Sequence, residues 1–177
     1  NVAYAPVMFS RGCPYKCHFC HISKELEGSL GGNTRKYRIK SINRIIKELK
    51  ILKNLGVKYV FIEDDSLLAK KERAKEIFSK VKELGLQLAD VNGINLAHLC
   101  TKVDGKLGVD DALMESMAGA GFKRLQYPVE SASQRILDKY ATGKLNLKKH
   151  DVFGLIKKAN ELGIEVVGNY TFGYPDE

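Results

Sequence analysis

Short apolar runs alternate along the chain with longer amphipathic stretches, and the apolar runs are rich in β-branched and aromatic residues. Runs of this kind, bounded by polar or glycine-containing segments, predict strands. The predicted strands are Ala3–Phe9, Val57–Ile62, Gln87–Ile94, Arg124–Val129 and Glu165–Phe172. Between them apolar residues recur with a helical period, which predicts helices near residues 42–55, 77–84, 110–120, 133–140 and 147–162.

Glycines and capping residues support this alternation. A glycine stands where four of the helices should end, at positions 56, 85, 121 and 163, and common N-cap residues precede three helices, namely Ser41, Asp110 and Ser133. Repeated strand–helix units predict a parallel sheet with right-handed crossovers, as a (β/α) barrel or as an open doubly wound sheet. Five strands are too few to close an eight-stranded barrel, so we expect an α/β fold with a partial (β/α) barrel of about five units. Functional loops should then gather at the carboxyl ends of the strands.

Composition and charge indicate how the chain is organised and which classes of function they disfavour. A chain of 177 residues, 44% of them hydrophobic, can bury one core, and its first residue is Asn rather than Met. We therefore expect residues 1–177 to be one domain, truncated at both ends, of a longer chain. No apolar run is long enough to span a membrane and the N-terminus does not resemble a signal peptide, so a cytoplasmic location is the default. The net charge of +8 comes largely from lysines interleaved with glutamates, which is typical of solvated helix faces and makes nucleic-acid binding unlikely.

Three of the four cysteines, Cys13, Cys17 and Cys20, fall within eight residues directly after the first predicted strand. This spacing is typical of a metal site rather than a disulfide framework, and soft thiolates select zinc or an iron–sulfur cluster. Three thiolates can hold a four-iron cluster and leave one iron open to a ligand other than cysteine. The alternative is a zinc site completed by His18 or His21.

The Cys-x-x-x-Cys-x-aromatic-Cys pattern of residues 13–20 resembles the signature of the radical S-adenosylmethionine (SAM) superfamily. The resemblance implies a [4Fe-4S] cluster on Cys13, Cys17 and Cys20, with SAM bound to the open iron. It also implies reductive cleavage of SAM to a 5′-deoxyadenosyl radical, which abstracts a hydrogen atom from a substrate. Phe19, at the aromatic position, is then expected near the adenine, and no catalytic residue is assigned beyond the cluster.

Residues after the second and fifth predicted strands also resemble motifs of the superfamily. Asp64 and Asp65 follow the second strand, where members of the superfamily contact the amino group of SAM. The paired acids are closest to members that combine the radical domain with a cobalamin-binding domain, although acids are also common at a helix N-terminus. Gly173 follows the fifth strand, where the superfamily backbone approaches the adenine.

The fourth strand end carries Glu130 and Ser131, in a stretch that resembles one found in the cobalamin-associated and methylthio-transfer groups. The resemblance implies that these residues contact the ribose and the methionine carboxylate. A basic residue further on often helps to hold the carboxylate, and here that region ends at Lys144. The alternative is a helix capped by Ser133 with an ordinary acid before it.

Taken together, the order of these motifs implies a radical SAM core, most like the cobalamin-associated enzymes. We expect hydrogen abstraction in a cobalamin-linked methyl transfer or rearrangement, a small-molecule substrate, and an electron donor similar to flavodoxin or ferredoxin. Cobalamin would bind through a domain outside residues 1–177. Two alternatives stay open: a non-catalytic α/β module held by a zinc or iron–sulfur site, and an RNA methylthio-transfer core. Cys100 stands apart from the motif, and we expect it to be a buried apolar thiol.

Overall fold

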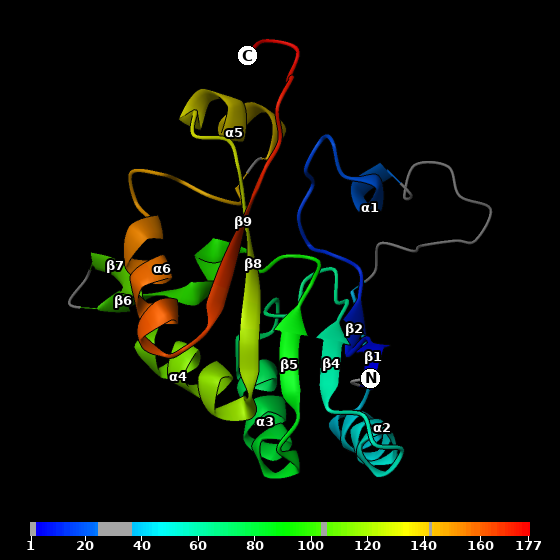
Figure 1. Cartoon of the computed structure of the whole chain (residues 1–177). Coiled ribbons are helices and arrows are strands. Elements are labelled where there is room, and N and C mark those ends of the chain that lie inside the picture. The colour runs from blue at the N-terminus through cyan, green and yellow to red at the C-terminus, as the bar shows by residue number, and fades with distance from the viewer. Residues whose placement is uncertain (1–2, 25–36, 104–105, 142) are drawn as a thin grey trace.

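The computed structural model describes residues 3–24, 37–103, 106–141 and 143–177. Its main sheet has five parallel strands in the order β1-β4-β5-β8-β9, so each strand lies beside its successor in the chain (Figure 1). The strands are β1 (Tyr4–Val7), β4 (Tyr59–Ile62), β5 (Gln87–Asp90), β8 (Phe122–Glu130) and β9 (Glu165–Tyr170). A sequential order without reversal is that of a partial (β/α) barrel. The predicted fold class and all five strands are confirmed.

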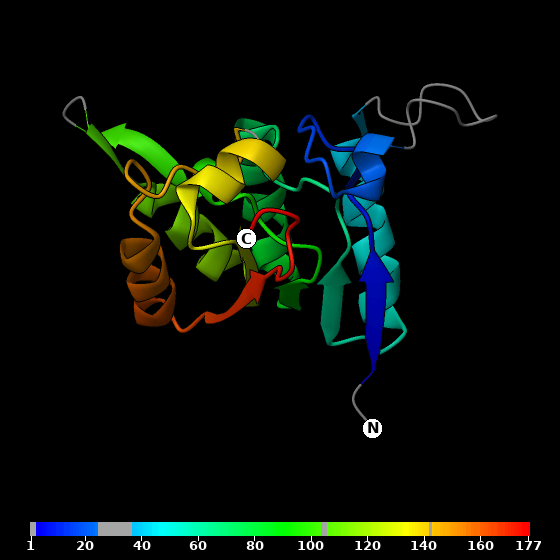
Figure 2. The same ribbon diagram turned by 90° about the horizontal axis from the view of Figure 1, so that it is seen from above.

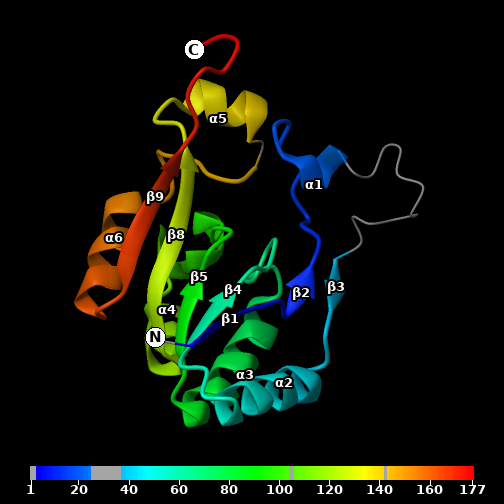
Figure 3. The ribbon, with the colours of Figure 1, turned by 45° about the vertical axis from the view of Figure 1, so that its right-hand side comes forward.

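The helices lie around this sheet in two groups. The longer helices between consecutive strands of the main sheet are α2 (Ile42–Asn54), α3 (Lys71–Val81) with the 3₁₀ turn η1 (Lys82–Leu84), α4 (Asp111–Ala120) and α6 (Val152–Glu161). Helix α3 packs on α4, and α4 and α6 pack on the sheet (Figure 2). The short helices α1 (His21–Lys24) and α5 (Gln134–Tyr140) instead lie beyond the carboxyl ends of the strands (Figure 3). The carboxyl ends therefore form a mouth flanked by α1 and α5.

The core fills the space between the sheet and α2, α3, α4 and α6. Phe78 of α3 meets Phe122 of β8 edge to face, with ring centroids 5.2 Å apart, and both are buried. Gly121 ends α4 with φ of 101°, and a Cβ there would lie 2.2 Å from the Leu86 carbonyl oxygen. Only glycine tolerates both this conformation and this approach of α4 to β5.

All three predicted N-cap residues stand at helix N-caps. Ser41 Oγ accepts a hydrogen bond from Arg44 N at 3.3 Å, and Asp110 Oδ1 accepts one from Leu113 N at 3.1 Å. Ser133 occupies the N-cap of α5, but its side chain makes no capping bond.

The last helix is shorter than predicted. It begins at Val152 rather than near residue 147, because Asp151 caps it through Gly154 N at 2.8 Å. The strand predicted for Gln87–Ile94 likewise ends at Asp90, whose Oδ2 accepts from Gly93 N at 3.0 Å and closes a turn. In both places a local aspartate bond stops the element, as expected for this residue type.

The remaining elements of the described chain are small and were not predicted from the sequence. Strands β2 (Ser10–Arg11) and β3 (Arg38–Ile39) pair antiparallel, and so do β6 (Cys100–Val103) and β7 (Lys106–Val109), which stand between β5 and α4. The 3₁₀ turn η2 (Leu96–Leu99) leads into β6. Cys100 is buried at 6% exposure, as predicted. Among the described helices, none combines the length and the apolar surface needed to cross a bilayer.

Candidate active site

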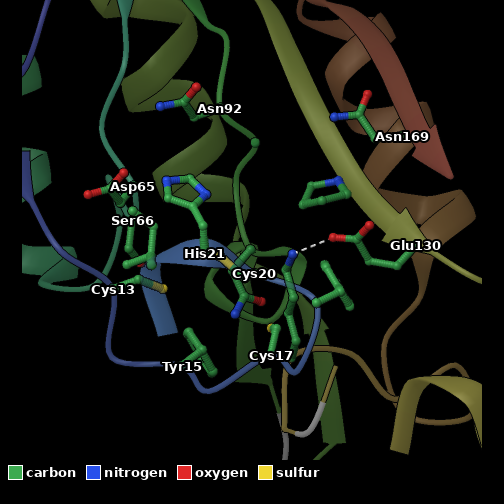
Figure 4. Close-up of a pocket in the computed structure, with 16 residues that line it drawn as sticks. Cys13, Tyr15, Cys17, Cys20, His21, Asp65, Ser66, Asn92, Glu130 and Asn169 are labelled. Carbon is green, nitrogen blue, oxygen red and sulfur yellow. Dashed lines mark hydrogen bonds and ion pairs between the residues drawn. The ribbon is translucent and has the colours of Figure 1, made fainter. Parts of the chain in front are cut away.

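The three motif cysteines line one cavity at the mouth of the sheet. Cys13, Cys17 and Cys20 belong to the segment of residues 12–20, here called the cysteine loop, which lies between β2 and α1. The cavity has a volume of about 300 Å³, and residues from the ends of β4, β5, β8 and β9 line its other sides (Figure 4). The loop therefore faces the strand ends across a space where a ligand can bind both.

Two carboxylates at the end of β4 accept hydrogen bonds from the segment that leads into this loop. Asp64 is fully buried; its Oδ1 accepts from Phe9 N at 2.6 Å, and its Oδ2 accepts from the hydroxyl of Ser10. Asp65 Oδ2 accepts from Gly12 N at 2.6 Å. Burial raises the pKa of Asp64 to about 6, although the bonds from Ser10 and Phe9 favour its charged form. The paired acids thus fix the backbone of residues 9–12, directly before Cys13.

Aromatic side chains hold the other end of the cysteine loop. His18 N donates to Tyr140 O at 2.8 Å, which connects the loop to the end of α5. Phe19 meets Tyr174 edge to face at 6.0 Å, and Tyr174 stacks on Tyr140 at 4.9 Å. Tyr140 Oη also donates to Asp176 Oδ1 at 2.9 Å. The segment after β9 therefore joins α5 and the cysteine loop into one packed unit.

The three motif thiols share the cavity without converging on one point. Within residues 3–24, 37–103, 106–141 and 143–177, no three His, Cys, Asp or Glu side chains are close enough together to hold a single metal ion. Soft thiolates suit iron–sulfur clusters, and a four-iron cluster takes each thiolate on a different iron. The donor set at this cavity therefore fits an iron–sulfur cluster on Cys13, Cys17 and Cys20. Burial raises the pKa of the Cys13 and Cys17 thiols, so binding of metal must drive their deprotonation.

An ion pair closes the side of the cavity formed by β8. Lys144 Nζ lies 2.6 Å from Glu130 Oε1, and Thr171 Oγ1 donates to Glu130 Oε2 at 3.2 Å. Both charged side chains are largely buried, with 17% of Lys144 and 10% of Glu130 exposed. Glu130 has φ of 68°, the one positive value among the described residues other than glycine. Such a conformation costs about 1–3 kcal/mol and is characteristic of functional sites.

The structure brings together most of the predicted site residues. Those that line the cavity are Cys13, Cys17, Cys20, Phe19, Asp65 and Glu130. Asp64 does not line the cavity; its carboxylate accepts from Phe9 N and from the Ser10 hydroxyl instead. Ser131 is buried at 4% exposure, and its Oγ accepts from Ser133 N at 3.1 Å at the start of α5. Gly173, with φ of 82°, turns the chain after β9 outside the cavity lining.

Other polar residues complete the lining. The sequence had indicated Asn92 and Asn95 as candidates for the substrate side, and Lys144 in the region expected to hold the carboxylate, and all three line the cavity. Tyr15, Ser66 and Asn169 also line it and were not singled out from the sequence. The available signal was their position in or near the carboxyl ends of predicted strands, which meet at one edge of a parallel sheet. Thr142, which precedes Lys144 in the predicted carboxylate-holding region, lies outside the described residues.

A strand-end cavity lined by three cysteines, on a partial (β/α) barrel, is the arrangement expected of an iron–sulfur enzyme domain. The model of the "Radical SAM superfamily" matches residues 7–177. The chain therefore belongs to the radical SAM superfamily, whose members use a [4Fe-4S] cluster and SAM, and it is an enzyme domain of that class.

Individual relatives agree with this assignment. An uncharacterized methyltransferase of Pyrococcus horikoshii is 29% identical over 100% of the chain and 34% of its own length. Cytidylyl-2-hydroxyethylphosphonate methyltransferase of Streptomyces wedmorensis is 30% identical over 94% of the chain and 28% of its own length. The chain thus spans about a third of these relatives. The solved structure of the radical SAM methyltransferase TsrM of Kitasatospora setae, with cobalamin and a [4Fe-4S] cluster bound, shares the fold with a TM-score of 0.74. It is 16% identical, and the match covers 99% of this chain and 32% of that one.

Proposed function

We propose that this domain cleaves SAM reductively and uses the resulting radical in a methyl-transfer reaction. The observation that carries the proposal is the single cavity shared by the three motif thiols and the polar ends of β4, β8 and β9. Cys13, Cys17 and Cys20 would hold the [4Fe-4S] cluster. When bound and reduced, the cluster supplies the electron that breaks the carbon–sulfur bond of SAM to give the 5′-deoxyadenosyl radical.

The residues around the cavity have separate tasks in this proposal. Asp64 and Asp65 keep the approach to the cysteine loop in place through the backbone of residues 9–12. Glu130 accepts hydrogen bonds from the ribose hydroxyls of SAM, and Lys144 turns from Glu130 to the methionine carboxylate. Phe19, beside Tyr174 at the rim, packs near the adenine. The strained backbone of Glu130 places its carboxylate on the cavity side of β8.

Methyl transfer is proposed because relatives along the whole chain carry that activity in their names. Cobalamin is proposed as a second cofactor because TsrM, which shares the fold, was solved with cobalamin bound. It would bind through a part of the protein outside residues 1–177. A flavodoxin-like or ferredoxin-like protein would supply the electron, and the substrate would be a small molecule.

Single cysteine variants test the proposal. After anaerobic reconstitution with iron and sulfide, the unaltered chain and the Cys100→Ala control should each hold about four irons. Cys13→Ala, Cys17→Ala and Cys20→Ala should each lose most of this iron, since each thiolate binds a separate iron. Full iron content in the Cys17→Ala protein, or one tightly bound zinc in the unaltered protein, would contradict the proposal.

A further inference from the structure

Two arginines face each other in the strand pair that leads into the cysteine loop, and the proposed function does not use them. Strands β2 and β3 pair antiparallel, with Arg11 directly opposite Arg38. Both side chains are exposed, and Arg11 lies two residues before Cys13. The strand pair lies beyond the carboxyl end of β1, on the side of the molecule away from β9 (Figure 3). Two guanidinium groups therefore lie beside the loop that would hold the cluster.

Both arginine side chains lie on the outer face of the strand pair. Ser10, the residue before Arg11 on β2, points inward, because its hydroxyl donates to the buried carboxylate of Asp64. Successive residues of a strand point to opposite faces, whereas residues directly opposite each other in an antiparallel pair share one face. Arg11 therefore points away from Asp64, and Arg38 lies beside it on that face.

The inner side of the strand pair is fixed to the rest of the domain. Arg73 of α3 donates through Nη2 to Phe9 O at 3.2 Å and to Lys40 O at 2.8 Å. Phe9 directly precedes β2 and Lys40 directly follows β3, and Lys40 N donates to Phe9 O at 3.0 Å. One side chain of α3 thus holds both strands, so the outer face is a supported surface.

The charges of the two arginines are not neutralised by ion pairs. Neither Arg11 nor Arg38 has an ion-pair partner among the residues that the structure describes. Two cations that follow β3 do have one, since Lys40 and Arg44 lie 2.6 Å and 2.9 Å from the carboxylate of Glu48. The arginines of the strand pair are thus available to a negatively charged partner.

The described segments around the strand pair carry positive charge only. Residues 3–24 and 37–47 contain lysines and arginines but no Asp or Glu, and Lys16 of the cysteine loop is exposed. Like charges directly opposite each other in a ladder are destabilising, and such departures from favourable local pairing are expected at functional sites. Carboxylates of a partner, placed against both arginines, would remove this repulsion and form charge-assisted hydrogen bonds.

We propose that the outer face of β2 and β3, which carries Arg11 and Arg38, is the docking surface for the acidic protein that supplies the electron. This inference rests on the proposed function and names the surface that its electron donor uses. The position favours an electron carrier over other acidic partners, because the strand pair leads directly into Cys13 and a protein bound there lies close to the cluster. One electron passes from the reduced flavin or iron–sulfur group of the carrier to the oxidised cluster. The carrier is oxidised and the cluster reduced by one electron, and no bond forms or breaks.

Reduction kinetics of the reconstituted proteins test the inference, with a reduced flavodoxin of negative net charge as the probe. Arg11→Glu and Arg38→Glu should each be reduced about fivefold more slowly than the unaltered protein, because charges at a docking surface act mainly on the association rate. At about 1 M salt most of this difference should vanish, since the screening length falls to about 3 Å. Lys123→Glu is the matched control, because it makes the same change of charge at an exposed position at the amino end of β8, opposite the mouth.

Reduction by dithionite separates docking from effects on the cluster itself. Dithionite is a small molecule that needs no docking surface, so its rate should stay within about twofold in all three variants. An unchanged rate with flavodoxin in Arg38→Glu, or an equal loss with dithionite or in Lys123→Glu, would overturn the inference and leave the proposed function intact.

Two other results would also overturn the inference. Loss of iron from both Arg11→Glu and Arg38→Glu would mean that the arginines serve to hold the cysteine loop. Binding of a short RNA that both variants abolish, with flavodoxin reduction unchanged, would assign the face to nucleic acid. Failure of the unaltered chain to bind iron would instead overturn the proposed function.

Discussion

Replacing Asp64 removes the carboxylate that fixes the start of the cysteine loop, because its two oxygens accept from Phe9 N and from the Ser10 hydroxyl. Phe9 and Ser10 are buried at 1% and 3% exposure, so water cannot replace the lost acceptor. An unsatisfied buried donor costs about 1–3 kcal/mol. Asp64→Asn keeps an oxygen for Phe9 N and an amide for the Ser10 oxygen, whereas Asp64→Ala keeps neither. We therefore expect the Ala variant to be about 2–4 kcal/mol less stable than the Asn variant.

The difference in stability between Asp64→Asn and the unaltered protein depends on pH. Burial raises the pKa of Asp64 from 3.8 to about 6, so the folded protein binds this proton more tightly than the unfolded chain. A raised carboxyl pKa means that stability is highest when the group is protonated, and that it falls as the pH rises from about 4 to above 6. A rise of about 2 pH units corresponds to about 3 kcal/mol. Asp64→Asn lacks the titrating carboxyl group and therefore does not lose this stability. Its free energy of unfolding relative to that of the unaltered protein should thus increase as the pH rises from about 4 to above 6.

Urea unfolding of the iron-free proteins at pH 4.5 and pH 8 would measure both effects, with Glu63→Ala as a control at the neighbouring acid. The Asn variant should gain stability relative to the unaltered protein at the higher pH, and it should also retain iron on reconstitution. A deficit of the Asn variant that grows with pH would refute the reasoning, because it would mean that the charged form of Asp64 is the stabilising one. Equal stability of the Ala and Asn variants would refute the role of the two hydrogen bonds.

Two further predictions concern ligand binding and the sheet edge. Glu130→Ala should weaken SAM binding to the reconstituted protein about tenfold, since hydrogen bonds to a charged group are worth about 1.5–3 kcal/mol, and equilibrium dialysis would measure it; unchanged affinity would move the ribose contact elsewhere. Strand β9 is an edge of the described sheet with Tyr170 53% exposed, so the chain of residues 1–177 should self-associate, and Tyr170→Lys should reduce this in light scattering. A strictly monomeric unaltered chain would contradict the second prediction.

The main sheet could be predicted because each strand contains a short run of mainly apolar residues bounded by polar or glycine-containing segments. Strand β8, for example, is buried over its last four residues, Tyr127–Glu130. The pairs β2–β3 and β6–β7 escaped prediction because their two to four residues do not belong to longer apolar runs, as the short strands β1, β4 and β5 do. The cysteine loop was placed at the strand ends by its position directly after the first apolar run.

The contacts within the site could not be predicted, because they join residues far apart in the chain. Asp64 and Asp65 are adjacent in sequence, yet one is fully buried under the loop and the other lines the cavity. Which carboxylate faces which way depends on how the chain leaves β4. The pairing of Glu130 with Lys144 likewise depends on a positive φ at Glu130, which no local sequence pattern announces in a residue other than glycine.

Electron paramagnetic resonance of the reduced, reconstituted chain, recorded with and without SAM, tests most directly whether Cys13, Cys17 and Cys20 hold a cluster with one iron open to SAM. We expect about four irons per chain and a signal that changes when SAM is added, because SAM binds the iron that lacks a cysteine ligand. A four-iron signal that SAM leaves unchanged, or a protein that binds zinc and gives no signal, would contradict this assignment.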